Sequence, residues 1–442
     1  MAVDSSSRAT VAAIASSSAP TRVRWYIVAL LAITAGLTYI DRLNLGIVGK
    51  YIQEEFHFST QTMGWILGAF SMGYALFHIP GGWLADRFGP RRVLAGAIVW
   101  FSSFTALTAI APNIPLLKLL GAAWAFVVVR FVMGAGEAAA MPVGNKMMAY
   151  WLSDKERAFG TGIFLAGVGA GGITAPFIIS SIVGAWGWRA AFVLLGVAGI
   201  TVAALWFVLV RDRPEDHPWI NTAELAIIGR SGMEAPSKRA KLKVPWARVL
   251  TSRSMWGLMI GHFCLVYPVY IFFTWFFIYM LRVRGVSIAK ASFWGSAPFA
   301  ANLVMVPLWG WLSDRIAGRV GKRQGRRLAA WLGIGCSAVL LYGGSHTASN
   351  NLALSQLALA AGFNFAASAV LWTTCNDISA KYSGSVSGVM TTFGSLGGWA
   401  SPVITGGIAT RFGWTYALDF ASLVTLISGV GWLLVDADQP LE

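Results

Sequence analysis

Long apolar runs alternate with short polar segments along almost the whole chain. The runs are about 20 residues long, which is the length that an α-helix needs to cross the hydrocarbon layer of a membrane. Charged residues lie mainly in the segments between the runs. The pattern therefore predicts an all-α, polytopic membrane protein with twelve transmembrane helices, at 25–49, 60–84, 93–111, 119–150, 158–184, 189–210, 254–281, 289–312, 328–347, 352–376, 384–410 and 414–435.

The composition leads to the same prediction. Of the 442 residues, 56% are hydrophobic and 12% are charged, whereas soluble domains carry about 25% charged residues. Such a chain has too few polar residues to cover a surface that faces water, so the lipid bilayer is its expected surrounding. The three cysteines lie in or beside predicted spans and have no CxxC spacing, so neither a disulfide framework nor a metal site is predicted.

A net charge of +15 would suggest nucleic-acid binding in a soluble protein. Here most Lys and Arg residues lie in the N-terminal segment and in the loops that follow even-numbered spans. Positive residues favour the cytoplasmic side of a membrane. We therefore interpret the charge as a topology signal: no nucleic-acid partner is expected, and both termini are predicted to be cytoplasmic. The compact loops favour a cell inner (plasma) membrane.

The longest polar stretch between spans divides the chain into two groups of six. It contains four prolines and many basic residues, which is typical of a linker, with a short surface helix around Thr222–Arg230. A monomer is expected. The predicted organisation is a disordered cytoplasmic tail at 1–24, an N-terminal six-helix bundle at 25–210, a cytoplasmic linker at 211–253, a C-terminal six-helix bundle at 254–435 and a cytoplasmic tail at 436–442.

One short motif occurs twice. Gly82–Arg87 reads Gly-Trp-Leu-Ala-Asp-Arg, and Gly310–Arg315, 228 residues later, reads Gly-Trp-Leu-Ser-Asp-Arg. A repeat at half the chain length indicates two similar halves, and in transporters such halves rock against each other around a site at the membrane midplane. We predict a gating role on the cytoplasmic side for the charged residues of these loops: Asp86, Arg87, Arg91, Asp314 and Arg315.

Glycines recur in spans 5 and 11, each followed by a proline, Pro176 and Pro402. Small residues allow helices to approach closely. Breaks at matched positions of two halves also point to a translocation region. Both interpretations remain open, and they predict that these spans pack tightly.

Four charged residues lie inside two predicted spans: Asp41 and Arg42 in the first, Arg130 and Glu137 in the fourth. A charge near the bilayer centre costs at least ~2.5–3.5 kcal/mol, so these groups should face each other or a wet cavity. One interpretation is a fixed salt-bridge clamp. The other is a proton relay next to an anion site, with Asp41 and Glu137 carrying protons and either arginine binding the anion, because guanidinium groups capture carboxylates in bidentate geometry.

The second half lacks these charges. A shift of 228 residues places Val269 opposite Asp41, Tyr270 opposite Arg42, Ala358 opposite Arg130 and Phe365 opposite Glu137. Rings and hydroxyl groups are present instead, and they either pack and anchor the helices or orient a polyhydroxylated substrate. The candidates for the cavity lining in this half are Tyr270, Trp372, Asn376, Thr391 and Ser395.

No enzyme signature is present. The five histidines form no HExxH motif, and there is no Ser/His/Asp grouping or phosphate-binding loop. We therefore expect no enzyme activity and no cofactor, and we expect an ion gradient to supply the energy for transport.

Gly82–Arg92 resembles the signature loop of the major facilitator superfamily, and Gly310–Arg315 is a degenerate second copy. Within that superfamily, Tyr39–Asn44, Gly73–Gly82 and Arg130–Glu137 resemble the anion:cation symporter branch, as does Trp151–Ala158. The resemblance covers the whole membrane region. It implies the fold with two pseudo-symmetric six-helix bundles and the transport of sugar acids, tartrate, phthalate or sialic acid.

The resemblance also implies roles for single residues. Asp41 and Glu137 match the acids that carry protons, Arg42 matches the ligand of the substrate carboxylate, and Arg130 matches the partner that pairs with Asp41 in one state. Tyr39 and Tyr74 match tyrosines of the cavity lining. Two departures leave the substrate open: span 11 lacks the Asn that sugar-acid members have near Thr391 and Ser395, and His78 stands where Gln is common.

The expected function is the proton-coupled uptake of a small organic anion, most simply a hexonate or hexuronate, by alternating access. The alternatives are symport of another carboxylate, of the tartrate or phthalate type, and organophosphate/phosphate exchange. Exchange of phosphate esters would require a second arginine from span 7, which has none. Outside transport, a membrane sensor that carries nothing is the remaining alternative.

Overall fold

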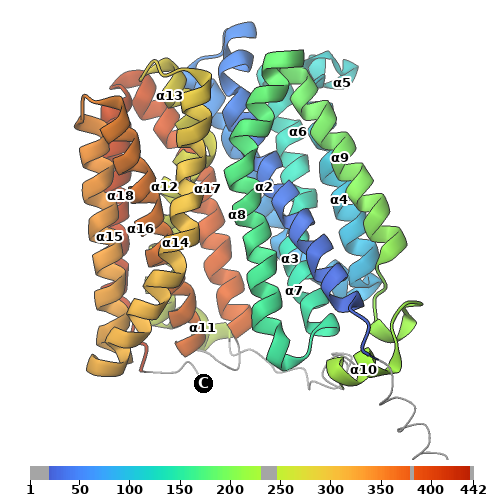
Figure 1. Ribbon diagram of the computed structural model, residues 1–442. Coiled ribbons are helices and arrows are strands. Elements are labelled where there is room, and N and C mark those ends of the chain that lie inside the picture. The colour runs from blue at the N-terminus through green and yellow to red at the C-terminus, as the bar shows by residue number, and fades with distance from the viewer. Residues whose placement is uncertain (1–18, 230–245, 379–382, 439–442) are drawn as a thin grey trace, which may run out of the picture.

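The computed structural model describes residues 19–229, 246–378 and 383–438, and within these ranges every regular element is a helix. Most of the two predicted tails and part of the predicted linker lie outside the described residues, as do the side chains of Asp86 and Asn376. Two bundles of long helices stand side by side (Figure 1). Each bundle comes from one half of the chain, as the repeated motif predicts.

The first bundle contains α2 (Val23–Glu55), α3 (Thr60–Phe88), α4 (Pro90–Thr108), α6 (Ala122–Glu137), α7 (Ala140–Trp151), α8 (Asp154–Trp186) and α9 (Trp188–Leu209), with the short η1 (Ala111–Asn113) and α5 (Pro115–Lys118) before α6. The second contains α12 (Arg253–Thr274), α13 (Phe276–Arg282), α14 (Ile288–Val320), α15 (Lys322–His346), α16 (Asn350–Ile378), α17 (Ser383–Arg411) and α18 (Trp414–Leu434). Between them lie η2 (Pro214–Asp216), α10 (Thr222–Ile228) and α11 (Trp246–Thr251).

Ten of the predicted spans fall on single long helices, whereas the fourth is divided between α6 and α7 and the seventh between α12 and α13. In the described part of the chain, eight helical stretches are long and apolar enough to cross a membrane: α2, α6 with α7, α8, α9, α12, α15, α16 and α18. The all-α membrane fold is therefore confirmed. The count of twelve spans stays a prediction, because α3, α4, α14 and α17 are long helices that do not meet the same test.

The fourth predicted span is divided into α6 and α7, and the break lies before Pro142 rather than at it. A proline cannot donate a hydrogen bond to the carbonyl four residues earlier, and its ring clashes with that carbonyl. For Pro142 this carbonyl belongs to Ala138, which is the residue that follows the end of α6 at Glu137. The break therefore lies directly beside the membrane-embedded acid.

The glycines of span 5 allow α8 to pack closely against α2. A Cβ atom at Gly167 would lie 2.1 Å from the carbonyl oxygen of Ala32, and one at Gly171 would lie 2.3 Å from that of Gly36. Gly162, in contrast, has no neighbour within 4 Å. Tight packing is confirmed for part of the glycine run only.

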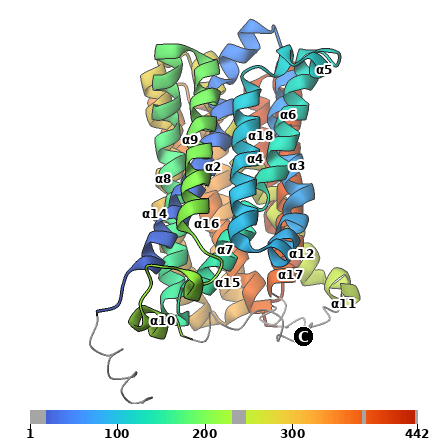
Figure 2. The ribbon, with the colours of Figure 1, turned by 90° about the vertical axis from the view of Figure 1, so that its right-hand side faces the viewer.

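Figures 1 and 2 show α10 and α11 at one end of the bundles, which we call the linker end. The two bundles are joined in the opposite half. Arg282 is 3.3 Å from Glu54, and the hydroxyl groups of Ser292 and Ser296 donate to α8. Among the described residues, every hydrogen bond and ion pair between the bundles lies in this half.

Candidate functional site

The charged residues predicted inside the membrane meet between α2 and α6. Arg42 donates from Nε to Oε1 of Glu137 across 2.6 Å. The Glu137 side chain is fully buried, and that of Arg42 is 10% exposed. A buried ion pair repays the cost of losing water only when its geometry is good. The mutual pairing predicted from the sequence is therefore realised by Arg42 and Glu137.

Aromatic rings surround the Arg42 guanidinium. Its carbon lies 4.5 Å from the ring centre of Tyr74, 5.1 Å from that of Tyr39 and 5.3 Å from that of Phe70. Tyr39 is three residues before Arg42 on α2, and Phe70 is four residues before Tyr74 on α3, so each pair shares a helix face. Ring faces attract a cation without neutralising it. This environment holds the guanidinium in place without cancelling its charge.

Close contact between α3 and α6 brings these rings to the ion pair. A Cβ atom at Gly134 would lie 2.1 Å from the carbonyl oxygen of Phe70, and one at Gly73 would lie 2.0 Å from that of Phe131. Only glycine fits at such distances. The two helices therefore touch backbone to backbone one turn before Glu137.

Asp41 and Arg130 form the other part of the site. Asp41 is fully buried, and neither of its carboxylate oxygens has a hydrogen-bond partner among the described residues. Its polar neighbours are Thr105, Arg130 and Glu137. The expected ion pair between Asp41 and Arg130 is not present: Arg130 donates to the sulfur of Met133 at 3.0 Å and lies 5.3 Å from the ring centre of Phe70.

The Phe70 ring thus lies 5.3 Å from the guanidinium carbons of both Arg42 and Arg130. Sequence reasoning missed it, because one phenylalanine in an apolar run has no distinguishing mark. The available signal was its spacing of four residues from Tyr74. An aromatic ring there offers a cation–π contact to both guanidinium groups.

From the second bundle, the structure brings Tyr270 to this site. Tyr270 lies within electrostatic range of Tyr39 and Arg42, and the ring of Phe273, 5.3 Å from the Tyr270 ring, is 5.9 Å from that of Tyr39. Gly398 makes room for it, since a Cβ atom there would lie 2.6 Å from the Tyr270 ring. Tyr270 is also the residue that the shift of 228 places opposite Arg42.

The other candidates of the second bundle have no described contact with the Arg42 group. Trp372 is 41% exposed, and its ring lies 5.9 Å from that of His262. The Thr391 hydroxyl donates to the carbonyl of Ser387, and Ser395 is 9% exposed. Their predicted role in substrate binding stays a prediction, and the same holds for Asn376, whose side chain is outside the described set.

The predicted gating residues make their described contacts within their own bundles. Arg91 donates to the carbonyl of Phe207, and Arg87 lies over the rings of Trp83 and Phe88. Asp314 is 2.6 Å from Arg326, and Arg315 lies over the Trp311 ring. The Asp86 side chain is outside the described set. The gating role of all five stays a prediction.

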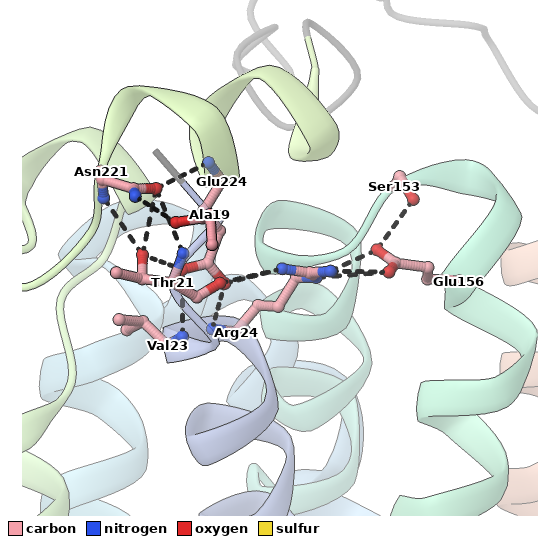
Figure 3. Close-up of polar contacts among 8 residues, drawn as sticks. All are labelled: Ala19, Thr21, Val23, Arg24, Ser153, Glu156, Asn221 and Glu224. Atoms are coloured by element: carbon pink, nitrogen blue, oxygen red, sulfur yellow. Dashed lines mark hydrogen bonds and ion pairs between the residues drawn. The ribbon is translucent and has the colours of Figure 1, made fainter. Parts of the chain in front are cut away.

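A buried polar cluster anchors the start of α2, the helix that carries Tyr39, Asp41 and Arg42 (Figure 3). Glu224 of α10 accepts hydrogen bonds from the backbone N–H groups of Val23 and Arg24, both at 3.0 Å. Its carboxylate is also 2.9 Å from the Arg24 side chain, which reaches Glu156 of α8 at 3.0 Å.

This cluster satisfies N–H groups that every helix start leaves without partners. The short helix predicted around Thr222–Arg230 is confirmed as α10. Sequence reasoning placed it on the surface, but its Glu224 is fully buried against the first bundle. The linker therefore begins as part of that bundle. It does so because a carboxylate and a helix N-terminus attract each other.

Known proteins resemble this chain along nearly its whole length. The sequence profile described as Major Facilitator Superfamily matches residues 31–402. A probable sulfoacetate transporter of Cupriavidus necator is 32% identical over 95% of this chain and 96% of its own. A D-galactonate transporter of Escherichia coli is 31% identical over 95% of this chain and 97% of its own. A probable galactarate/D-glucarate transporter of Bacillus subtilis is 30% identical over 94% of this chain and 92% of its own.

Solved structures show the same fold at lower identity. A bacterial homologue of the human lysosomal transporter Spinster, in an inward-facing and occupied conformation, has a TM-score of 0.75 at 20% identity. The match covers 94% of this chain and 97% of the chain of that homologue. A D-xylose–proton symporter has a TM-score of 0.71 at 15% identity, with 93% and 98% covered.

Proposed function

This chain belongs to the major facilitator superfamily, a family of membrane transporters and not of enzymes; from that premise we propose that it takes up an organic anion together with protons. The proposed site is the group of Arg42, Glu137, Asp41 and Arg130 with its aromatic surround. The two bundles rock around this site by alternating access. We further propose that the protein lies in a cell inner membrane as a monomer with both termini in the cytoplasm.

The observation that carries the proposal is the ion pair between Arg42 and Glu137. An anionic substrate and the Glu137 carboxylate compete for the same guanidinium. A proton on Glu137 removes its charge and frees Arg42 for bidentate binding of the substrate carboxylate. Proton binding and anion binding therefore favour each other, and such coupling is reciprocal by thermodynamic necessity.

Asp41 provides the second proton site in this proposal. It is buried without a hydrogen-bond donor in the described part of the chain, and a charged group in that condition is expensive. When Asp41 is protonated, the site can close into a dry interface. When the protons leave, Asp41 regains its charge and attracts Arg130, which resets the empty carrier.

For the substrate we propose a sugar acid such as a hexonate or hexuronate. Relatives named for galactonate and for galactarate/D-glucarate support this choice. A relative named for sulfoacetate makes a smaller anion the alternative. The described site favours neither by itself, because Arg42 is suited to any carboxylate and its surround is aromatic. Tartrate and phthalate belong in the same test.

Organophosphate exchange is the next alternative. It would need a second basic residue facing Arg42 from α12, and α12 carries a single arginine, Arg253, at its first position at the linker end. A membrane sensor without transport would not require an ion pair that a substrate can open. Neither alternative has an observation in its favour.

The test is uptake into proteoliposomes with an imposed pH gradient, acid outside. Galactonate, glucuronate, glucarate, sulfoacetate, tartrate and phthalate are offered singly. We expect at least one to accumulate against its gradient, and a protonophore should abolish the accumulation. Glu137→Gln should lose accumulation, whereas Glu215→Gln, which changes an exposed acid outside the spans, should retain it. Accumulation that is unchanged when the protonophore is added would contradict the proposal.

A further inference from the structure

A groove of about 410 Å³ lies on the first bundle between α3, α4 and the break after α6. Phe77 and Leu84 line it from α3, and Gly96 and Trp100 line it from α4. These four residues are exposed to the surroundings of the bundle. On the prediction that α3 and α4 cross the membrane, a groove on this face is filled by lipid rather than by water.

One basic residue stands at the linker end of this groove. Arg92, the third residue of α4, lines it and is exposed. It makes no hydrogen bond or ion pair with the described residues. Of the charged groups near it, Arg91 is a like charge, and Asp212 accepts from the backbone N–H of Arg91 at 2.8 Å and makes no described ion pair with Arg92.

We propose that an anionic phospholipid binds this groove, with its phosphate on Arg92 and an acyl chain along the apolar trough. From Arg92 to Trp100 the helix rises ~12 Å, which accommodates the upper part of an acyl chain. Small residues open the trough at its inner wall: Ala135, Gly136 and Ala139. They flank Glu137, so an acyl chain in the groove packs against the helix break beside the ion pair.

A second groove supplies a control. It lies on α15 and α16, has a volume of about 500 Å³, and is lined by Trp331, Gly335, Cys336 and Phe363 among other apolar residues. Its lining contains no basic residue. Gly96 and Gly335 are a matched pair for substitution, because a Cβ atom at either position meets no atom within 4 Å. A leucine at either position fills its groove without a clash at Cβ.

The test uses the full chain in detergent, with phosphatidylglycerol or phosphatidylcholine added. Native mass spectrometry counts the retained lipid, and thermal unfolding measures stabilisation. We expect phosphatidylglycerol to be retained and to raise the Tm more than phosphatidylcholine. Arg92→Ala should weaken phosphatidylglycerol retention about fivefold, which is the effect of one basic residue at an anionic headgroup. Gly96→Leu should reduce it as well, and Gly335→Leu should not.

Three results would overturn the proposal. Equal retention of the two lipids would show that the headgroup charge has no effect. Equal losses in Gly96→Leu and Gly335→Leu would mean that the lipid contacts are unspecific. If glycerol phosphate alone raised the Tm as much as the lipid does, the site would bind an anion and the groove would not contribute to binding. The Tm in phosphatidylcholine should be the same for wild type and Arg92→Ala, which shows that the variant is folded.

Discussion

The two bundles of this protein share their layout and differ in their cores. In the first, Asp41, Arg42, Arg130 and Glu137 occupy buried positions. In the second, the positions related by the 228-residue shift are Val269, Tyr270, Ala358 and Phe365. The duplication therefore provides a scaffold that can rock, and the charged chemistry belongs to one half only. This difference explains why a repeat detectable in the loops is absent from the site.

The second bundle still contributes to the site, but by contact rather than by charge. Tyr270 reaches the Arg42 group from the position that corresponds to Arg42 itself. A phenol can orient an anion and can pack against a ring, but it carries no charge to pair with Arg42. The comparison predicts that substitutions in the first core abolish transport and that matched substitutions in the second only weaken it.

The largest expected effect comes from Arg42. Arg42→Ala removes the anion ligand and leaves Glu137 buried without a partner, so uptake should fall to background, a loss of at least about 100-fold. The matched change, Tyr270→Ala, should lower uptake about tenfold at most. The measurement is the initial rate of uptake into proteoliposomes. Equal losses in the two variants would remove the asymmetry between the cores.

Asp41 should follow in size. Asp41→Asn keeps the shape of the side chain and removes its proton chemistry, so accumulation driven by a pH gradient should fall about tenfold or more. Exchange of labelled for unlabelled substrate, which needs no net proton movement, should survive. Val269→Ala at the matched position should leave both assays near wild type. Loss of exchange in Asp41→Asn would point to a structural role instead.

Phe70 offers a smaller effect with a distinct signature. Phe70→Leu keeps an apolar side chain and removes the ring that lies 5.3 Å from both Arg42 and Arg130. A cation–π contact at a buried position is worth roughly 1–2 kcal/mol, so anion affinity should change about five- to thirtyfold. Phe70→Tyr should behave as wild type. An affinity unchanged in Phe70→Leu would show that the ring is only packing material.

The smallest effect concerns the anchors at the linker end. Glu224→Gln weakens the buried acceptor for two N–H groups and Arg24, and should destabilise the protein by about 2 kcal/mol. The start of the second bundle has a lighter anchor, in which Ser254 accepts from the backbone N–H of Asp436 at 3.0 Å. Ser254→Ala should therefore cost about 1 kcal/mol. Thermal unfolding in detergent would measure the loss of stability in each variant. A larger loss in Ser254→Ala than in Glu224→Gln would contradict this account.

The sequence predicted the fold well, since apolar runs of membrane-crossing length leave few alternatives and the motif at Gly82 and Gly310 marks the duplication. The pairing of membrane charges was also predictable, because isolated charges are too costly there. Which charges pair was not. Arg42 lies with Glu137 while Asp41 remains without a donor among the described residues, and this choice depends on helix rotation and on the contact at Gly134.

Two further features depend on tertiary contacts that a local pattern does not contain. The break between α6 and α7 precedes Pro142 because a proline acts on a carbonyl four residues earlier. Glu224 looks like an ordinary acid of a polar linker, and its burial follows from where α10 docks. Short-range signals thus identify residues that are unusual for a membrane, but they do not identify ordinary residues in unusual places.

The central claim is that the anion and the Glu137 carboxylate compete for Arg42, so that a proton on Glu137 favours binding of the anion. The most direct measurement is the Kd of the transported anion as a function of pH, in wild type and in Glu137→Gln. In wild type the Kd should fall as the pH falls, by up to about tenfold per pH unit for one coupled proton. In Glu137→Gln this dependence should be lost or reduced by that one proton, with tight binding retained at high pH. A Kd that depends on pH equally in both proteins would contradict the claim.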